Sequence, residues 1–215
     1  MVNSLARSAA RWNPFRSECV ERLSFRLSEG GWADLFARLE AADFRGAIVG
    51  PKGSGKTTLL LELAERLRAR GEEVDAVLAD GPAPVTEVEF DSVLIRVRRG
   101  AGLLFLDGAD RFPERRWRQL RAAIPPTRGF VITEHRPGRL PVVFECGTTS
   151  ALLADLVREI LAGDHRYDAS AVRLASQPSD DYLGRLLAHY EGNIRSALWH
   201  LYDCWAAGEW REPKS

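Results

Sequence analysis

The chain has 215 residues, of which 45% are hydrophobic and 28% charged, and its 30 basic side chains equal its 30 acidic ones. This length suits one core of about 100–150 residues with a smaller attachment. Because the formal net charge is zero, no field of the whole protein attracts nucleic acid or a membrane surface, and such a partner would have to meet a local patch.

Targeting, membrane and disulfide signals are not seen in this sequence. The stretch from Met1 to Arg11 lacks the apolar centre of a signal peptide, and no run approaches the roughly 20 apolar residues of a membrane span. We therefore expect a cytoplasmic protein with no membrane partner. The three cysteines have neither C-x-x-C nor His-flanked spacing, so we expect reduced packing residues rather than disulfides or a zinc site: Cys19, Cys146 and Cys204.

Residues 1–43 are predicted to form an N-terminal segment that ends in a helix. Asn13-Pro14-Phe15 reads as a turn, and the stretch from Trp32 to Ala42 has the spacing of an amphipathic helix. Its large apolar side chains share one face, as expected of a helix that packs on a core: Trp32, Leu35, Phe36 and Leu39.

The most specific motif in the chain follows this helix. It fits the phosphate-binding pattern G-x-x-x-x-G-K-S/T at every fixed position, with the residues Gly50, Pro51, Lys52, Gly53, Ser54, Gly55, Lys56 and Thr57. The apolar run Ala47-Ile48-Val49 before it is typical of a buried strand. After it, leucines recur at helical spacing from Leu59 until Gly71 ends the pattern. A strand, a loop and a helix in this order are the context that the motif requires.

The chemistry of this motif predicts a nucleoside triphosphate with Mg²⁺ as the ligand. Glycines let the backbone turn so that several N–H groups point inward and form a nest for phosphate. Lys56 is expected to reach the β- and γ-phosphates, and the Thr57 hydroxyl to bind Mg²⁺. Thr58 opens the following helix, whose positive N-terminus adds to the anion site.

The rest of the core alternates strands and helices. Val74 to Ala79, Leu103 to Asp107, Gly129 to Thr133 and Pro141 to Phe144 are predicted strands, and Phe90 to Val97 is predicted as a helix. This alternation favours an α/β fold, a P-loop NTPase parallel sheet covered by helices on both faces, with its ligand at the carboxyl ends of the strands. We assign residues 44–147 to this core and 148–215 to a small C-terminal helical lid.

Asp107 ends the unbroken apolar run Leu103-Leu104-Phe105-Leu106, which is the position of a Walker B aspartate. There it can hold Mg²⁺ through water beside Thr57. The alternative is an aspartate that merely caps the next turn. The following residues are Gly108, Ala109 and Asp110, so no glutamate stands directly after the Walker B position.

Without that glutamate, another group must polarise the attacking water, or hydrolysis is slow. Asp110 and Glu134 are the two carboxylates in suitable places, the second at the end of the strand expected beside Asp107. Each also has an ordinary interpretation. Asp110 could cap the helix of Trp117 and Leu120, and Glu134 could be a solvated loop residue.

With these motifs the chain resembles the AAA+ and STAND group of P-loop ATPases, in particular compact members such as transposition-helper and origin-recognition ATPases. The resemblance spans roughly residues 44–205. It implies that Thr133 is the sensor 1 residue, which hydrogen-bonds water or the γ-phosphate. It also implies that Arg195, within Gly192-Asn193-Ile194-Arg195, is the sensor 2 arginine of the lid. Arg136 and Arg139 are the residues available as an arginine finger.

The resemblance implies a nucleotide-dependent switch that binds ATP and Mg²⁺ and hydrolyses ATP slowly or with a partner's help. Large aromatic side chains concentrate near the C-terminus and make a protein partner at the lid plausible: Trp199, Tyr202, Trp205 and Trp210. Most are expected to pack on the lid's own helices, and exposure of Trp205 and Trp210 would indicate a surface for a protein partner. No guanine-reading N-K-x-D motif is present, which favours ATP.

Two other functions stay open on the sequence. A P-loop kinase would carry the same phosphate loop, with Arg111, Arg115, Arg116 and Arg118 as a cluster for the acceptor's phosphate. The stretch from Arg111 to Arg121, with Trp117, could alternatively contact nucleic acid. On an amphipathic helix such arginines are more often a solvated face, and the zero net charge favours that interpretation.

Overall fold

The structure is a computed structural model that describes residues 13–27, 31–79, 81, 83–99, 102–163 and 177–213. Its strands are β1 (Arg45–Val49), β2 (Val74–Leu78), β3 (Leu103–Asp107), β4 (Phe130–Glu134) and β5 (Val142–Glu145). Its helices are α2 (Ser17–Val20), α3 (Gly31–Ala41), α4 (Lys56–Ala69), α5 (Glu87–Arg99), η1 (Ala109–Arg111), α6 (Glu114–Ala123), α7 (Ser150–Gly163), α8 (Asp180–His189) and α9 (Ile194–Ala207).

Contacts divide the chain into two units, each with its own core. The sheet-bearing unit comprises Ser24–Pro51 and Gly55–Cys146, and the helical unit comprises Met1–Leu23, Lys52–Ser54 and Gly147–Ser215.

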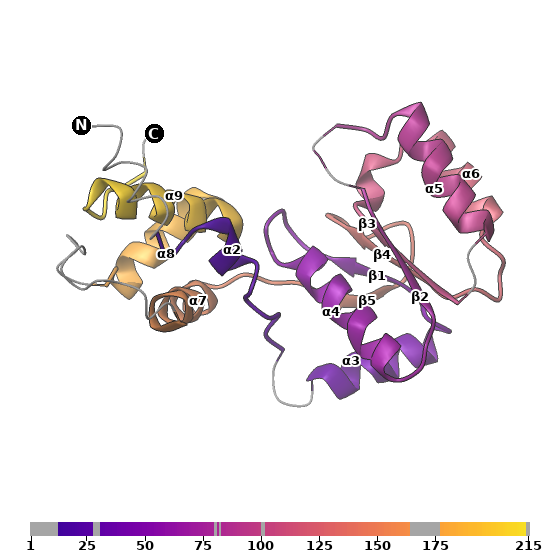
Figure 1. Cartoon of the computed structure of the whole chain (residues 1–215), viewed down its shortest axis with the longest axis horizontal. Helices are drawn as coiled ribbons and strands as arrows, with labels where there is room; N and C mark the ends of the chain where they lie inside the picture. Colours follow the sequence, from indigo (N-terminus) through magenta and orange to yellow (C-terminus); the bar gives the residue numbers. More distant parts are fainter. Residues whose placement is uncertain are drawn as a thin grey trace. The chain divides into compact units, whose positions relative to one another are not determined.

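The sheet-bearing unit is built on one parallel sheet of five strands in the order β2-β3-β4-β1-β5 (Figure 1). The expected α/β class and parallel sheet are therefore confirmed. Strand β4 lies between β1 and β3, with Val49 opposite Glu134 and Leu106 opposite Ile132. The carboxyl ends of these three central strands consequently meet at one edge of the sheet, which we call the carboxyl edge.

Helices cover both faces of this sheet (Figure 1). Alternation along each strand decides which face a side chain joins. Phe105 and Val131 pack with α3 and α4, whereas Leu106 and Ile132 pack with α5 and α6. All five residues of β3 are buried, as expected for a strand covered on both sides.

Helices α3, α4 and α5 lie where the sequence predicted helices. Helix α3 buries Leu35, Phe36 and Leu39 on the face that the sequence indicated. The ambiguous stretch around Phe90 is helical, and it buries Phe90, Val93 and Val97. Helix α4 ends where Gly71 takes a φ of 91°, because its N–H and that of Glu72 reach back to carbonyls of the last helical turn.

The helical unit packs α7, α8 and α9 around a leucine-rich core. The segment before α2 contributes to it. Asn13 is fully buried, donates its side-chain amide to the carbonyl of Tyr202 at 2.8 Å and accepts from Phe15 N at 3.0 Å. The ring of Phe15 meets the rings of Trp205 and Trp210 edge-on at 6.1 and 6.4 Å.

Candidate functional site

The loop of residues 50–55 joins β1 to α4 in the order that the phosphate-binding pattern requires. Gly53 and Gly55 have φ values of 75° and 87°, a region that side-chain-bearing residues rarely enter. At Gly55 the space is also tight, because a Cβ would lie 3.0 Å from the ring of Phe25. The glycines of the motif are therefore required by the backbone of the loop itself.

Lys56 is the first residue of α4 and is buried. Its ammonium group donates to the carbonyl oxygens of Gly50 and Pro51, both at 2.8 Å, so the side chain lies back along the loop. In the same loop Ser54 Oγ is buried, and no described residue offers it a hydrogen bond. A loop with a lysine ammonium over it and a buried hydroxyl in need of a partner fits a bound phosphate.

Thr57, Asp107 and Thr133 form one hydrogen-bonded group at the carboxyl edge. The Thr57 hydroxyl donates to Asp107 Oδ2 at 2.8 Å, and the Thr133 hydroxyl donates to Asp107 Oδ1 at 2.6 Å. Thr133 also accepts from the N–H of Gly108 at 2.8 Å. Three elements, α4, β3 and β4, thus place their polar side chains around one carboxylate.

This group fits Mg²⁺ rather than zinc or another metal that needs a full protein cage. Mg²⁺ is commonly held by one or two protein oxygens together with substrate phosphates and water, and Thr57 with Asp107 supplies such a pair. In the described parts of the chain, no three His, Cys, Asp or Glu side chains come together as a metal site.

Glu134 lies beside this group but points elsewhere. It follows Thr133 in β4, so its side chain leaves the strand on the α5 and α6 face. It is only 2% exposed, and its carboxylate accepts from Arg139 N at 3.4 Å. Burial raises the pKa of Glu134, and the nearby negative charge of Asp110 acts in the same direction. The interpretation of Glu134 as a solvated loop residue is wrong.

Asp110 does not cap α6, which begins after Pro113 without a side-chain cap. Its carboxylate instead accepts from the backbone N–H of His135 at 2.7 Å and lies 2.8 Å from His135 Nδ1. The loops that follow β3 and β4 are therefore joined by a direct Asp–His contact.

Arg139 is one of the two residues considered as an arginine finger, but its guanidinium binds other parts of the fold. Its guanidinium donates to the carbonyls of Ala109 at 2.5 Å and Phe112 at 2.7 Å, and it lies 4.6 Å from the ring centre of Trp117. It holds η1 in place on the end of β4. Arg136 is exposed in the same loop.

The arginines of residues 111–121 do not form one cluster. Arg111 donates to Ala83 O at 2.7 Å, and Arg116 donates to Val85 O and pairs with Glu87 at 3.7 Å. Trp117 is 4% exposed and stacks on Phe130, so it has no free face for a nucleic-acid base. Only exposed arginines such as Arg115 remain for the kinase and nucleic-acid interpretations.

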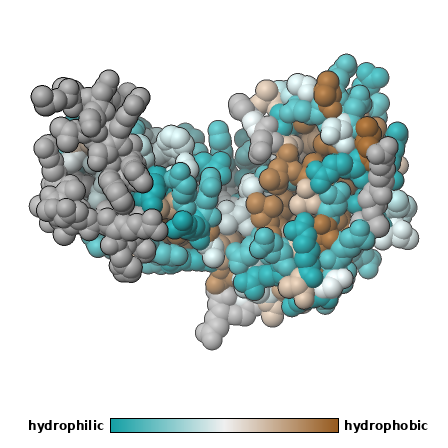
Figure 2. All heavy atoms as spheres, in the orientation of Figure 1, coloured by the Kyte–Doolittle hydropathy of each residue, from teal (hydrophilic) through white to brown (hydrophobic). Residues whose placement is uncertain are grey.

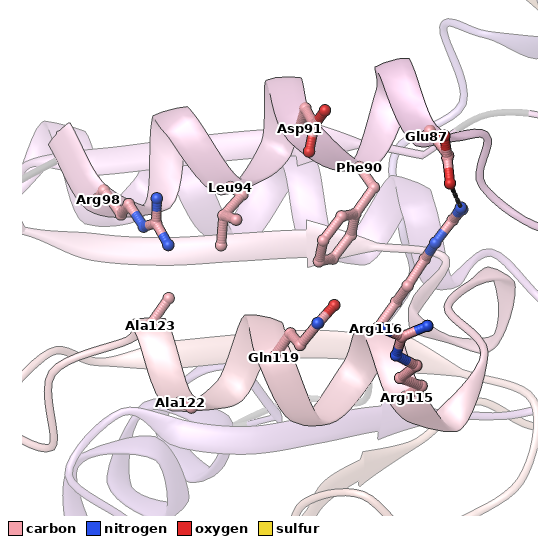
Figure 3. Close-up of a pocket in the computed structure, with 10 residues that line it drawn as sticks. All are labelled: Glu87, Phe90, Asp91, Leu94, Arg98, Arg115, Arg116, Gln119, Ala122 and Ala123. Atoms are coloured by element: carbon pink, nitrogen blue, oxygen red, sulfur yellow. Dashed lines mark ion pairs between the residues drawn. The ribbon is translucent and has the colours of Figure 1, made fainter.

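Arg115 and Arg116 line one side of an open groove of about 730 Å³ between α5 and α6 (Figure 3). Phe90 and Leu94 point into it from α5, and Arg98 lies toward its other end. Cations and acids share the rim, since Glu87 and Asp91 also line it. The groove therefore has no single sign of charge with which to select a partner.

In the helical unit, Arg195 is the second residue of α9 and is exposed. Asn193 caps the helix, since its side chain accepts from Ser196 N at 3.1 Å, and it follows Gly192, which has a φ of 81°. Trp205 and Trp210 are partly buried against Phe15, whereas Trp199 is 62% exposed.

On the sheet-bearing unit, Figure 2 shows apolar residues among charged ones, and exposed apolar side chains there include Leu61, Leu78 and Val142.

The sequence indicated the residues of the carboxyl edge but not the contact between Asp110 and His135. An acid three residues beyond Asp107 and a histidine two residues beyond Thr133 were the available signal.

None of the helices in the described ranges is both long and apolar enough to cross a bilayer. No protein-family model matches this chain, and a search of curated proteins returns no relative.

Proposed function

We propose that this chain is a P-loop ATPase of the AAA+ or STAND type that binds ATP with Mg²⁺ at the carboxyl edge and acts as a nucleotide-dependent switch. The observation that carries the proposal is the 2.8 Å hydrogen bond between Thr57 and Asp107, directly beside the loop that holds Lys56. This hydrogen bond supports a joint role for Thr57 and Asp107 in holding Mg²⁺. The phosphate-loop motif alone indicates only the first of these two ligands.

Each residue then has a specific role. The backbone N–H groups of residues 50–55 and the Lys56 ammonium bind phosphate, and Ser54 Oγ gains the hydrogen-bond partner it otherwise lacks. Thr57 and Asp107 hold Mg²⁺, which supplies positive charge to the phosphate oxygens. Thr133 fixes the Asp107 carboxylate from β4 and, as sensor 1, detects the terminal phosphate.

The proposed hydrolysis is slow, because the residue after Asp107 is Gly108 and brings no carboxylate. Among the described residues, Glu134 is the buried carboxylate besides Asp107 at this edge, and its raised pKa brings it closer to the range useful for a general base. Because the Glu134 side chain points away from Asp107, we expect low activity in the resting protein and higher activity when a partner binds.

The partner in this proposal is a protein that binds the lid. Trp199 supports this, because its side chain is 62% exposed in this structure. Exposed tryptophans of this kind often become buried at the centre of an interface when a partner binds. Arg195, as sensor 2, would link the state of the nucleotide to the lid.

Phosphate release from ATP by the purified protein tests the proposal, with Lys56→Ala and Glu134→Ala beside it. We expect slow release by the wild type without any acceptor, and loss of release in Lys56→Ala. ATP consumption that requires an added hydroxyl acceptor would favour the kinase alternative. ATP binding that is equal in wild type and Lys56→Ala would refute the proposed site.

A further inference from the structure

Asp110 and His135 form a fixed pair at the carboxyl edge. A single oxygen, Asp110 Oδ2, accepts from the His135 backbone N–H at 2.7 Å and lies 2.8 Å from the ring nitrogen Nδ1. Two contacts to one oxygen determine both the place and the orientation of the ring. The His135 side chain is nevertheless 50% exposed, so the other side of the ring is open.

The pair also favours one tautomer of the ring. The Asp110 carboxylate lies nearest to Nδ1, so its negative charge favours the neutral ring that carries hydrogen on Nδ1. In the neutral ring the lone pair then lies on Nε2. Among the described residues Nε2 has no hydrogen-bond partner, so it is available to a proton donor from outside the protein.

The position of the pair relates it to the phosphate loop. His135 directly follows Glu134, whose carbonyl accepts from the N–H of Gly50, the first residue of that loop, at 3.3 Å. Asp110 lies three residues after Asp107. The loop that carries Asp110 is held by Arg139 through the carbonyls of Ala109 and Phe112, so this loop is fixed to the end of β4.

We propose that His135 is a catalytic base of this site and that Asp110 is its positioning residue. The inference rests on the proposed binding of ATP at residues 50–57. In the step, the oxygen of a water molecule bonds to the terminal phosphorus, and its proton moves to His135 Nε2. The bond from that phosphorus to the bridging oxygen breaks, its electron pair stays on ADP, and the exposed imidazolium returns the proton to solvent.

The charges around the ring suit this role. Asp110 of η1 faces Nδ1, Glu134 precedes it in β4, and Arg136 and Arg139 follow in the same loop. Asp110 therefore orients the base, as a third group does in other nucleophile–base arrangements.

The first test needs no nucleotide. Long-range ¹H–¹⁵N NMR of the ATP-free protein reports which nitrogen of each histidine carries hydrogen. We expect the Nδ1–H form for His135 at a pH where the ring is neutral, and loss of that preference in Asp110→Asn. An Nε2–H form in the wild type would overturn the inference, because that nitrogen would then have no lone pair to accept a proton.

The second test compares phosphate release and its pH profile in wild type, His135→Gln and Asp110→Asn, with His189→Gln as the matched control. A general base contributes roughly 10²–10⁴-fold, and we expect a loss of that order in His135→Gln. Its acid limb, the fall in rate at low pH, should disappear. Asp110→Asn should lose less, and His189→Gln, in the other unit, nothing.

Calorimetric binding of Mg-ATP separates failure of this inference from failure of the proposed function. The inference holds if His135→Gln binds Mg-ATP like the wild type but releases phosphate slowly. It is overturned if His135→Gln keeps the rate and acid limb of the wild type, or if the wild type binds Mg-ATP and releases no phosphate. If the wild type does not bind Mg-ATP, the proposed function itself fails, and this inference with it.

Discussion

The two edges of the central sheet use their polar side chains differently. At the amino edge, Arg128 donates to the carbonyls of Val97 at 2.7 Å and Gly102 at 3.0 Å, and Arg45 donates to the carbonyl of Arg128 at 2.6 Å. At the carboxyl edge, Thr57 and Thr133 donate to the side chain of Asp107.

We interpret this difference as one between polar groups that hold the fold and groups that bind a ligand in the proposed function. The carbonyls at the amino edge belong to the last turn of α5 and to the residues just before β3 and β4, so the arginines there fix the backbone between packed elements. A side-chain carboxylate and two hydroxyls can change partners when a cation or phosphate arrives. We therefore expect substitutions at the amino edge to reduce stability and those at the carboxyl edge to reduce ligand binding.

Lys56→Ala should produce the largest effect on binding. Hydrogen bonds to charged groups contribute roughly 1.5–3 kcal/mol, so a fluorescent ATP analogue should bind about 10–150-fold more weakly. The free energy of unfolding should change less than the binding, because the partners of Lys56 include the loop carbonyls of Gly50 and Pro51. Lys52→Ala in the same loop is the matched control, and an equal loss there would remove the special role of Lys56.

Arg128→Met should show the opposite behaviour. It leaves the carbonyls of Val97 and Gly102 without the donor they now have, which costs roughly 1–3 kcal/mol of unfolding free energy. Arg128 is 7% exposed, and this burial lowers the pKa of its guanidinium. Urea unfolding measures the loss. Weaker binding of the ATP analogue, with stability intact, would contradict the assignment of Arg128 to the fold.

Thr133→Val should have an intermediate and mixed effect. It removes the 2.6 Å hydrogen bond to Asp107 and the acceptor of the Gly108 N–H, for a loss of about 1 kcal/mol in unfolding free energy. We expect phosphate release to fall by a larger factor than ATP affinity, since Thr133 acts on the terminal phosphate. Thr133→Ser keeps the hydroxyl and should restore release. If it does not, the hydroxyl is not the active group.

Glu134→Gln should have the smallest effect on stability, and this effect should depend on pH. Because burial raises the folded-state pKa of Glu134 above its ordinary value, its ionisation opposes folding. Its contribution to stability is therefore present below the ordinary pKa and lost as pH rises through the raised one. Unfolding measured from acid to neutral pH should show the wild type losing stability relative to Glu134→Gln. A constant difference across that range would contradict the raised pKa.

The sequence was sufficient to predict the sheet, because buried strands such as β3 are continuous apolar runs and the helices between them keep a 3.6-residue period. It also predicted that Asp107 and Glu134 would end neighbouring strands. It did not reveal that the two side chains leave the sheet on opposite faces, which depends on the register of β4 between β1 and β3.

Long-range side-chain contacts were the other part that the sequence did not show. The Asp110–His135 contact joins loops 25 residues apart, and the partners of Arg139 lie 27 and 30 residues away. None of these separations along the sequence follows a helical or strand period, so no local sequence pattern indicates the contacts. For the same reason the arginines from Arg111 to Arg121 read as one basic cluster, although the fold assigns Arg111 and Arg116 to separate carbonyls.

Calorimetric titration of Mg-ATP into the wild-type protein tests the central claim most directly, namely that the carboxyl edge is a ligand site rather than a part of the fold. We expect saturable binding at one site that needs Mg²⁺, weakens strongly in Lys56→Ala and is unchanged in Arg128→Met. Absence of binding by the folded wild type, or equal binding by Lys56→Ala, would contradict it.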